Sequence, residues 1–121
     1  MTASILTVDD SASLRMAIRI ALTGAGYAVT EAGDGVEGLA RAAETRFDLI
    51  VTDLNMPNMD GIALIRELRQ LPDYKFTPML MLTTESAADK KSEGKAAGAT
   101  GWLVKPFNPE QLVATVQKVL G

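Results

Sequence analysis

The sequence of 121 residues contains no cysteine and no histidine. Without cysteine the chain forms no disulfide and no thiolate metal site, and it has no thiol nucleophile. Without histidine it forms no Ser-His-Asp triad and no imidazole zinc site, and it cannot itself carry phosphohistidine. Any chemistry on this chain must therefore use carboxylates, hydroxyls, amides and lysine.

Three further features are missing. No block rich in lysine or arginine indicates a nucleic-acid partner, and no apolar run is long enough to span a bilayer. The short apolar stretch after Met1 runs directly into Asp9 and Asp10, which is unlike a signal peptide. The net charge of -3 is typical of ordinary solubility. We therefore expect a cytoplasmic monomer that neither binds nucleic acid nor inserts into a membrane.

Short apolar runs alternate along the chain with stretches of helical periodicity. The runs typical of strands are Ile5–Val8, Ala28–Thr30, Leu49–Thr52, Met79–Leu82 and Trp102–Val104. Four of them are continuously apolar, which is typical of a parallel sheet covered on both faces. Five such units, joined by right-handed crossovers, predict an α/β fold with a doubly wound parallel sheet, in a single domain over residues 1–121.

Five helices are expected between and after the strands. Their apolar faces are formed by Leu14, Ala17, Ile18, Ala21, Leu22 and Ala25; by Val36, Leu39, Ala40 and Ala43; by Leu64, Ile65, Leu68 and Leu71; by a weak pattern over Ala87–Ala97; and by Leu112, Val113, Val116, Val119 and Leu120. Either Asp10 or Ser11 could cap the first helix, and Asp60 and Asn108 are predicted N-caps.

Reactive side chains gather where the strands end. In doubly wound sheets ligands sit at the carboxyl ends of the strands. The first strand ends in Asp9 and Asp10, the third in Asp53, the fourth in Thr83 and Thr84, and the fifth in Lys105 and Pro106. The second strand ends in Glu31, Ala32 and Gly33, and we expect it to be uninvolved.

Each of these residues also has an ordinary interpretation. A lone Asp after a strand is usually a turn or capping residue, and a Thr or Lys at a strand end is usually structural or solvated. However, three neighbouring carboxylates repel one another unless a cation balances them, and Mg²⁺ suits such a site. Asp53 could then act as a nucleophile toward phosphorus, with Lys105 and Thr83 neutralising and binding the phosphoryl oxygens.

Four motifs together resemble the receiver domain of bacterial response regulators, especially its stand-alone chemotaxis members. They are VDDS at Val8–Ser11, TDLNMPNMDG at Thr52–Gly61, LTTE at Leu82–Glu85 and AGATGWLVKPF at Ala97–Phe107. The resemblance covers essentially the whole chain. It implies a flavodoxin-like (βα)5 fold with the sheet order 2-1-3-4-5.

The resemblance also implies a metal site and a phosphoacceptor. Asp53 would be phosphorylated by a histidine kinase of the chemotaxis type. Asp10 would bind Mg²⁺ directly and Asp9 mostly through water, with Asp53 and the backbone carbonyl of Asn55 completing the protein ligands. The chain would be a signalling protein that assists its own phosphorylation and dephosphorylation, and not an enzyme.

The remaining site residues would bind the phosphate or respond to it. Lys105 would contact the phosphate, Thr83 would hydrogen-bond it in the active state, and the Thr84 amide would lie nearby. Pro106 would follow a cis peptide bond. Trp102 stands where the family usually has Tyr, Phe or His as a switch residue. Because an indole is larger and has only a donor, Trp102 could instead be a fixed residue that faces a partner.

Other functions stay open from the sequence. The partner could be a flagellar motor switch protein, or the chain could be a phosphorelay shuttle or phosphate sink without any output. It could also be a piece of a longer protein with an output domain. A magnesium phosphohydrolase of the haloacid dehalogenase kind is a further alternative, but that family requires an acid two residues after the nucleophile, where this chain has Asn55.

Overall fold

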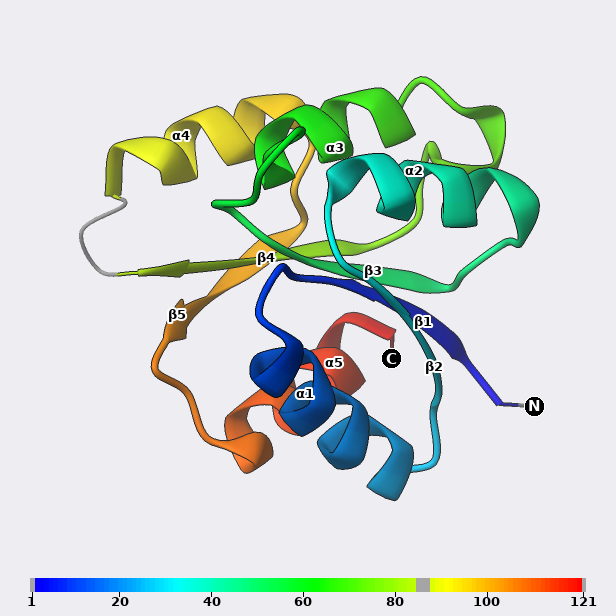
Figure 1. The fold of residues 1–121 in the computed structure, drawn as a ribbon, viewed down its shortest axis with the longest axis vertical. Coiled ribbons are helices and arrows are strands. Elements are labelled where there is room, and N and C mark those ends of the chain that lie inside the picture. Colours follow the sequence, from blue (N-terminus) through cyan, green and yellow to red (C-terminus); the bar gives the residue numbers. More distant parts are fainter. Residues whose placement is uncertain (1, 85–87, 121) are drawn as a thin grey trace.

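The computed structural model describes residues 2–84 and 88–120, and places five parallel strands in one sheet in the order β2-β1-β3-β4-β5 (Figure 1). The strands are β1 Ser4–Val8, β2 Ala28–Ala32, β3 Leu49–Asp53, β4 Met79–Thr84 and β5 Gly101–Lys105. All four neighbouring pairs are parallel. The predicted doubly wound fold and its strand order are confirmed.

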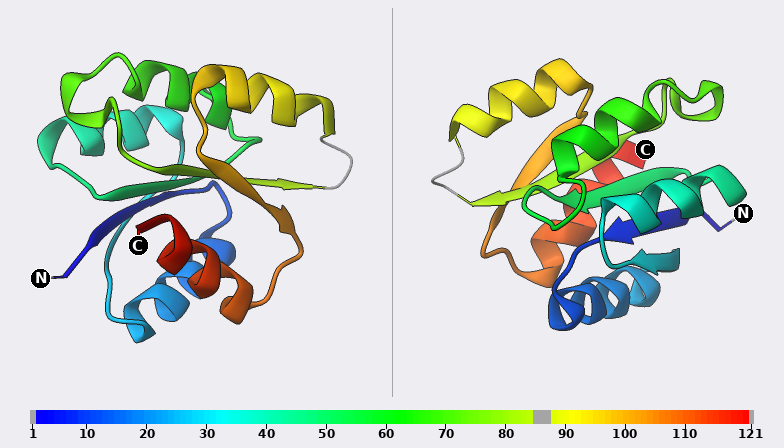
Figure 2. Two further views of the ribbon diagram at one scale, coloured as in Figure 1. Left: turned by 180° about the vertical axis from the view of Figure 1, so that it is seen from behind. Right: turned by 45° about the horizontal axis from the view of Figure 1, so that its top comes forward.

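Helices cover both faces of this sheet (Figures 1 and 2). One face carries α1 Ala12–Gly24 and α5 Pro109–Leu120, and the other carries α2 Gly35–Glu44, α3 Gly61–Leu68 and α4 Ala88–Ala97. Two apolar clusters follow from this arrangement, because successive strand residues point to opposite faces. Leu6, Ile50 and Met81 belong to the cluster under α2, α3 and α4, whereas Ile5, Val51 and Leu82 belong to the cluster under α1 and α5. No helix in the described part of the chain is long and apolar enough to cross a membrane.

Short-range signals set the helix ends. The Asn108 Oδ1 atom accepts from the Gln111 amide at 2.8 Å, and Gln111 Oε1 accepts from the Asn108 amide at 2.9 Å, which forms a reciprocal cap at the start of α5. Asp60 caps α3 as predicted. Ser11, and not Asp10, caps α1, since the Leu14 amide donates to its hydroxyl at 3.3 Å. The Asp10 carboxylate is therefore not used as the helix cap.

The predicted apolar face of α2 is wrong. Val36, Ala40 and Ala43 are exposed, and the helix instead buries Gly35, Gly38 and Ala42, with Leu39 half-buried beside them. The reason is close packing: a Cβ on Gly38 would lie 2.9 Å from a Val8 methyl group. Because the buried side of α2 consists mainly of glycine, the apolar pattern did not reveal it.

One other helix boundary differs from the sequence pattern. The third helix ends at Leu68, and Leu71 instead precedes a short 3-10 turn at Pro72–Tyr74. Ala87 and Glu85 lie outside the described residues. In α4, Gly94 is buried against Met81, where an added Cβ would lie 3.4 Å from the thioether. The glycine therefore allows a close approach of α4 to β4.

Candidate functional site

The reactive strand ends meet at one edge of the sheet. Asp9 follows β1 directly, Asp53 is the last residue of β3, and Lys105 is the last residue of β5. Asp9 and Asp53 are only 1% and 7% exposed, although carboxyl side chains usually lie at the surface, while Asp10 is exposed. Carboxylates are seldom this buried without a partner. Their burial between parallel strands therefore marks this edge as the candidate site.

The three carboxylates converge. Oxygen atoms of Asp9, Asp10 and Asp53 lie within 4.8 Å of one another. Asp53 Oδ1 accepts from its neighbour's amide, Leu54 N, at 2.9 Å and from Lys105 Nζ at 2.8 Å. Asp9 Oδ1 accepts from the Ser11 amide at 2.8 Å. Asp9 Oδ2 is buried and has no hydrogen-bond partner within residues 2–84 and 88–120, although Lys105 Nζ lies 3.7 Å away.

Electrostatics disfavour a charged Asp9. Burial raises the pKa of the Asp9 carboxyl, the negative charges of Asp53 and Asp10 raise it further, and the Ser11 amide and the Lys105 ammonium lower it. One ammonium thus faces three carboxyl groups. A hard divalent cation supplies the missing positive charge and takes oxygen ligands. The unpartnered Asp9 oxygen and the all-oxygen donor set fit a magnesium ion.

The fourth strand contributes hydroxyls. Thr83 is 2% exposed, and its Oγ1 atom has no hydrogen-bond partner among the described residues. Thr84 is exposed and lies opposite Lys105 in the register of β4 and β5. A buried hydroxyl without a partner is costly, so Thr83 has a donor to offer to a ligand at this edge.

The remaining predicted residues flank the site. Asn55 is exposed in the loop after β3. The peptide bond between Lys105 and Pro106 is cis, as the resemblance implied. Trp102 is half-buried on the face of α2, α3 and α4, opposite Met81 in the register, whereas Leu103 packs on the face of α1 and α5. The indole therefore stands on a different face of β5 from its neighbour, as strand alternation predicts.

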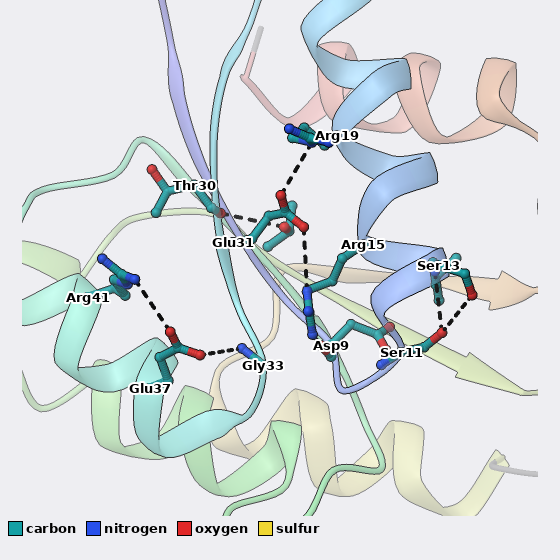
Figure 3. A network of polar contacts seen from close by, with 12 residues as sticks. Asp9, Ser11, Ser13, Arg15, Arg19, Thr30, Glu31, Gly33, Glu37 and Arg41 are labelled. Carbon is teal, nitrogen blue, oxygen red and sulfur yellow. Dashed lines mark hydrogen bonds and ion pairs between the residues drawn. The ribbon is translucent and has the colours of Figure 1, made fainter.

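The second strand lies beside this edge, and its Glu31 joins a polar network with α1. Figure 3 shows Glu31, near the end of β2, between two arginines of α1. Its carboxylate oxygens lie 3.5 Å from Arg15 Nε and 3.3 Å from Arg19 Nε. Arg15 also donates through Nη1 to the backbone carbonyl of Asp9 (Figure 3). The only sequence signal for this network was the spacing of two arginines at i and i+4.

The chain resembles several proteins of known sequence and structure. The sequence model of one protein family, the response regulator receiver domain, matches residues 5–117. The chemotaxis protein CheY of Pseudomonas aeruginosa is 40% identical over 116 residues, which cover 95% of this chain and 94% of that protein. The transcriptional regulatory protein ResD of Bacillus subtilis is also 40% identical, but the chain covers only 47% of it. The chain spans about half the length of ResD and of the MprA response regulators that it matches.

Solved structures give the same grouping. The chemotaxis response regulator CheY4 of Vibrio cholerae superposes with a TM-score of 0.94 at 55% identity, covering 98% of this chain and 99% of that one. The receiver domain of the sensor histidine kinase PA1611 from Pseudomonas aeruginosa has a TM-score of 0.92 at 29% identity, covering 100% of this chain and 99% of that one, and its structure holds a magnesium ion in the active-site cleft. From the matched residues and this shared fold, the chain belongs to the family of response regulator receiver domains.

Proposed function

We propose that the chain is a signalling phosphoacceptor whose Asp53 takes a phosphoryl group from a histidine kinase. The observation that carries the proposal is the buried Asp53 carboxylate, which the Lys105 ammonium contacts at 2.8 Å beside two further carboxyl groups. Both hydrogen bonds described above reach Oδ1, so Oδ2 is the oxygen that attacks phosphorus. The new P–O bond forms as the P–N bond to the donor imidazole breaks, and the imidazole keeps the electron pair of that bond.

The surrounding residues stabilise the transferred group. Lys105 supplies positive charge to the phosphoryl oxygens, and Thr83 donates its buried hydroxyl to one of them, with the Thr84 amide nearby. Bound Mg²⁺ would neutralise the phosphoryl charge. Asp10 and Asp53 would hold it directly, as would the Asn55 carbonyl, and Asp9 would act mainly through water. This arrangement assists phosphorylation and dephosphorylation of the chain's own aspartate, without turnover of a separate substrate.

The output that we propose is phosphorylation-dependent binding of a partner in the cytoplasm, in a chemotaxis pathway. The 55% identity to the chemotaxis response regulator CheY4 of Vibrio cholerae, compared with 40% to ResD, supports this choice over transcriptional control. The donor would be a CheA-like kinase and the target a flagellar motor switch protein. A phosphorelay shuttle or phosphate sink is the second candidate, because it needs the same site and no output target.

The phosphohydrolase alternative has less support. It requires an acid two residues after the nucleophile, and that position is Asn55, whose amide cannot act as a general acid or base at neutral pH. Turnover of a general phosphate ester by the purified protein would favour the hydrolase again.

The phosphoacceptor is tested with acetyl phosphate and Mg²⁺, followed by intact-protein mass measurement. We expect wild type to gain one hydroxylamine-labile phosphoryl group and Asp53→Asn to gain none. Asp73→Asn is the matched control, because Asp73 is exposed and precedes β4, whereas the site lies where the strands end. Stoichiometric aspartyl phosphate in Asp53→Asn would contradict the assignment. Pull-down with and without beryllofluoride separates an effector, which binds a partner in one state, from a phosphate sink.

A further inference from the structure

The side chains of Asp34 and Asn58 join two segments that are 24 residues apart. Asp34 is the N-cap of α2, and its Oδ1 atom accepts from the Glu37 amide at 2.8 Å. Its Oδ2 atom accepts from the Asn58 Nδ2 atom at 2.9 Å. One carboxylate therefore caps a helix with one oxygen and holds the loop between β3 and α3 with the other.

The contact fixes an unfavourable backbone conformation. Asn58 has φ of 71°, the one positive φ found among described residues other than glycine. Asn tolerates this region better than most residues but still prefers others. The hydrogen bond to Asp34 opposes relaxation of the loop at this residue.

Main-chain packing supports the same contact one residue further on. Gly35 opens α2, and a Cβ at this position would lie 2.5 Å from the Met59 carbonyl oxygen and 2.8 Å from the Met59 Cβ. The start of α2 thus lies directly against Asn58 and Met59. Met59 in turn packs on the buried cluster beneath α2 and α3.

The loop held in this way carries a predicted metal ligand. It begins directly after Asp53 and includes Asn55, whose backbone carbonyl belongs to the proposed magnesium ligands. A backbone carbonyl has no rotamer with which to adjust, so its position depends on the course of the loop. Residues that orient ligands from behind influence metal affinity strongly.

We propose that Asp34 and Asn58 act as a positioning pair that holds the loop after Asp53 in its metal-binding conformation. This inference rests on the proposed function. Neither side chain touches the metal or the phosphoryl group. The pair makes the start of α2, which contributes no ligand, a determinant of how tightly the site binds Mg²⁺.

The test measures Mg²⁺ affinity of the metal-stripped full chain by calorimetric titration with magnesium chloride. Asp34→Ser keeps a capping oxygen but cannot reach Asn58, and Asn58→Gly removes the amide while allowing the positive φ. We expect each to weaken Mg²⁺ binding on the order of tenfold. Combining them should cost little more than one alone, because both break the same contact.

Asp34→Asn is the matched control for charge. It loses the same negative charge as Asp34→Ser, but it still caps α2, and its amide can donate to Asn58 once the Asn58 side-chain amide turns over. We expect its Mg²⁺ affinity to stay within about twofold of wild type, since the contact is rebuilt. Urea unfolding of each metal-free variant shows whether a loss of affinity merely follows a loss of folding, and Asn58→Gly leaves the helix cap in place.

The results for these variants distinguish a failure of the positioning pair from a failure of the proposed function. Wild-type Mg²⁺ affinity in both Asp34→Ser and Asn58→Gly would overturn the positioning pair and leave the phosphoacceptor intact. An equal loss in Asp34→Asn and Asp34→Ser would show that charge, and not the contact, controls affinity, and would also overturn it. No Mg²⁺ binding by wild type would overturn both the pair and the metal part of the proposed function.

Discussion

Lys105 Nζ lies 2.8 Å from Asp53 Oδ1 and 3.7 Å from Asp9 Oδ2, so one ammonium group bridges carboxylates that come from two different strands. The lysine side chain is 25% exposed, whereas those of Asp53 and Asp9 are 10% and 2% exposed. In the function proposed above, Lys105 would therefore compete with a metal ion for these carboxylates and would also attract the phosphoryl group.

Replacing Lys105 should separate these two effects. We expect Lys105→Met to bind Mg²⁺ more tightly, on the order of fivefold, because a nearby positive charge is removed. Phosphorylation by acetyl phosphate should slow by at least about tenfold, since the transferred group loses its counter-charge. Calorimetric titration measures the Mg²⁺ affinity, and intact-protein mass measurement over time gives the phosphorylation rate. Lys118→Met, an exposed site on α5, should change neither. Weaker Mg²⁺ binding in Lys105→Met would contradict the competition.

The raised pKa of Asp9 predicts a pH dependence of stability. Because burial raises this pKa in the folded state above the usual 3.8, folding favours the protonated carboxyl. The contribution of Asp9 to the free energy of unfolding is therefore fully present below pH 3.8, where the carboxyl is protonated in both states. It is lost as the pH rises through the raised pKa of the folded state. Metal-free Asp9→Asn should therefore be more stable than wild type at pH 7, and the difference should shrink toward pH 4.

Urea unfolding in the presence of EDTA measures this difference. Excess Mg²⁺ should stabilise wild type more than Asp9→Asn, since the variant has lost a carboxylate beside the metal. A wild-type protein that is more stable than Asp9→Asn at pH 7 without metal, by a margin that shrinks toward pH 4, would show that ionised Asp9 stabilises the fold.

Two glycine substitutions should have opposite effects. Gly61 lies against the backbone carbonyl of Asp53, and an added Cβ would collide with that carbonyl. We expect Gly61→Ala to destabilise the protein by about 2 kcal/mol and to slow phosphorylation. Apart from its chain neighbours and the backbone of its own helix, no atom of the described residues lies within 4 Å of a Cβ added at Gly24. Gly24 also lies at the end of α1, so Gly24→Ala should stabilise by up to about 0.5 kcal/mol. Equal unfolding free energies for the two variants would contradict the close packing at Gly61.

Trp102 should report the phosphorylated state. The Thr83 hydroxyl has no partner among the described residues and should move to a new anion, which would change the packing near Trp102, two register positions along the paired strands. We expect beryllofluoride with Mg²⁺ to change the indole fluorescence. The change should vanish in Asp53→Asn and shrink in Thr83→Ala. A response to Mg²⁺ alone, with no further response to beryllofluoride, would remove Trp102 from the switch.

The fourth helix should exchange its amide hydrogens faster than the first. Over residues 91–97, α4 buries only Gly94 and Ala97, whereas α1 buries Ile18 and Leu22. Less buried apolar area gives a smaller cost of local opening. Hydrogen exchange of the unphosphorylated protein measures this. Equal protection of the two helices would count against α4 as part of a switching surface.

Local signals made much of this structure predictable. Strand runs such as Leu49–Thr52 and caps such as Asp60 and Asn108 depend on neighbours within a few residues, so the sequence reveals them. The convergence of Asp9 and Asp53 followed from the general rule that the carboxyl ends of parallel strands meet at one edge.

Contacts between segments far apart in the sequence could not be predicted from local patterns. The buried side of α2 is made by Gly35 and Gly38, which carry no apolar signal, and their role depends on Met59 and Val8 across the interface. The hydrogen bond from Asn58 to Asp34 likewise joins two residues 24 positions apart, and Asp and Asn are both common in caps and turns. Only the folded arrangement shows that these polar residues are partners.

The close approach of α4 to β4 at Gly94 has a mechanical consequence. The described part of this interface presents Gly94 and Ala97 to the sheet, so few side chains interlock there, and Met81 is the long side chain beneath Gly94. An unbranched thioether changes rotamer at low cost. We therefore expect α4 to shift along the sheet more readily than α1 does, and because Met81 is also the strand partner of Trp102, such a shift would be felt at the indole.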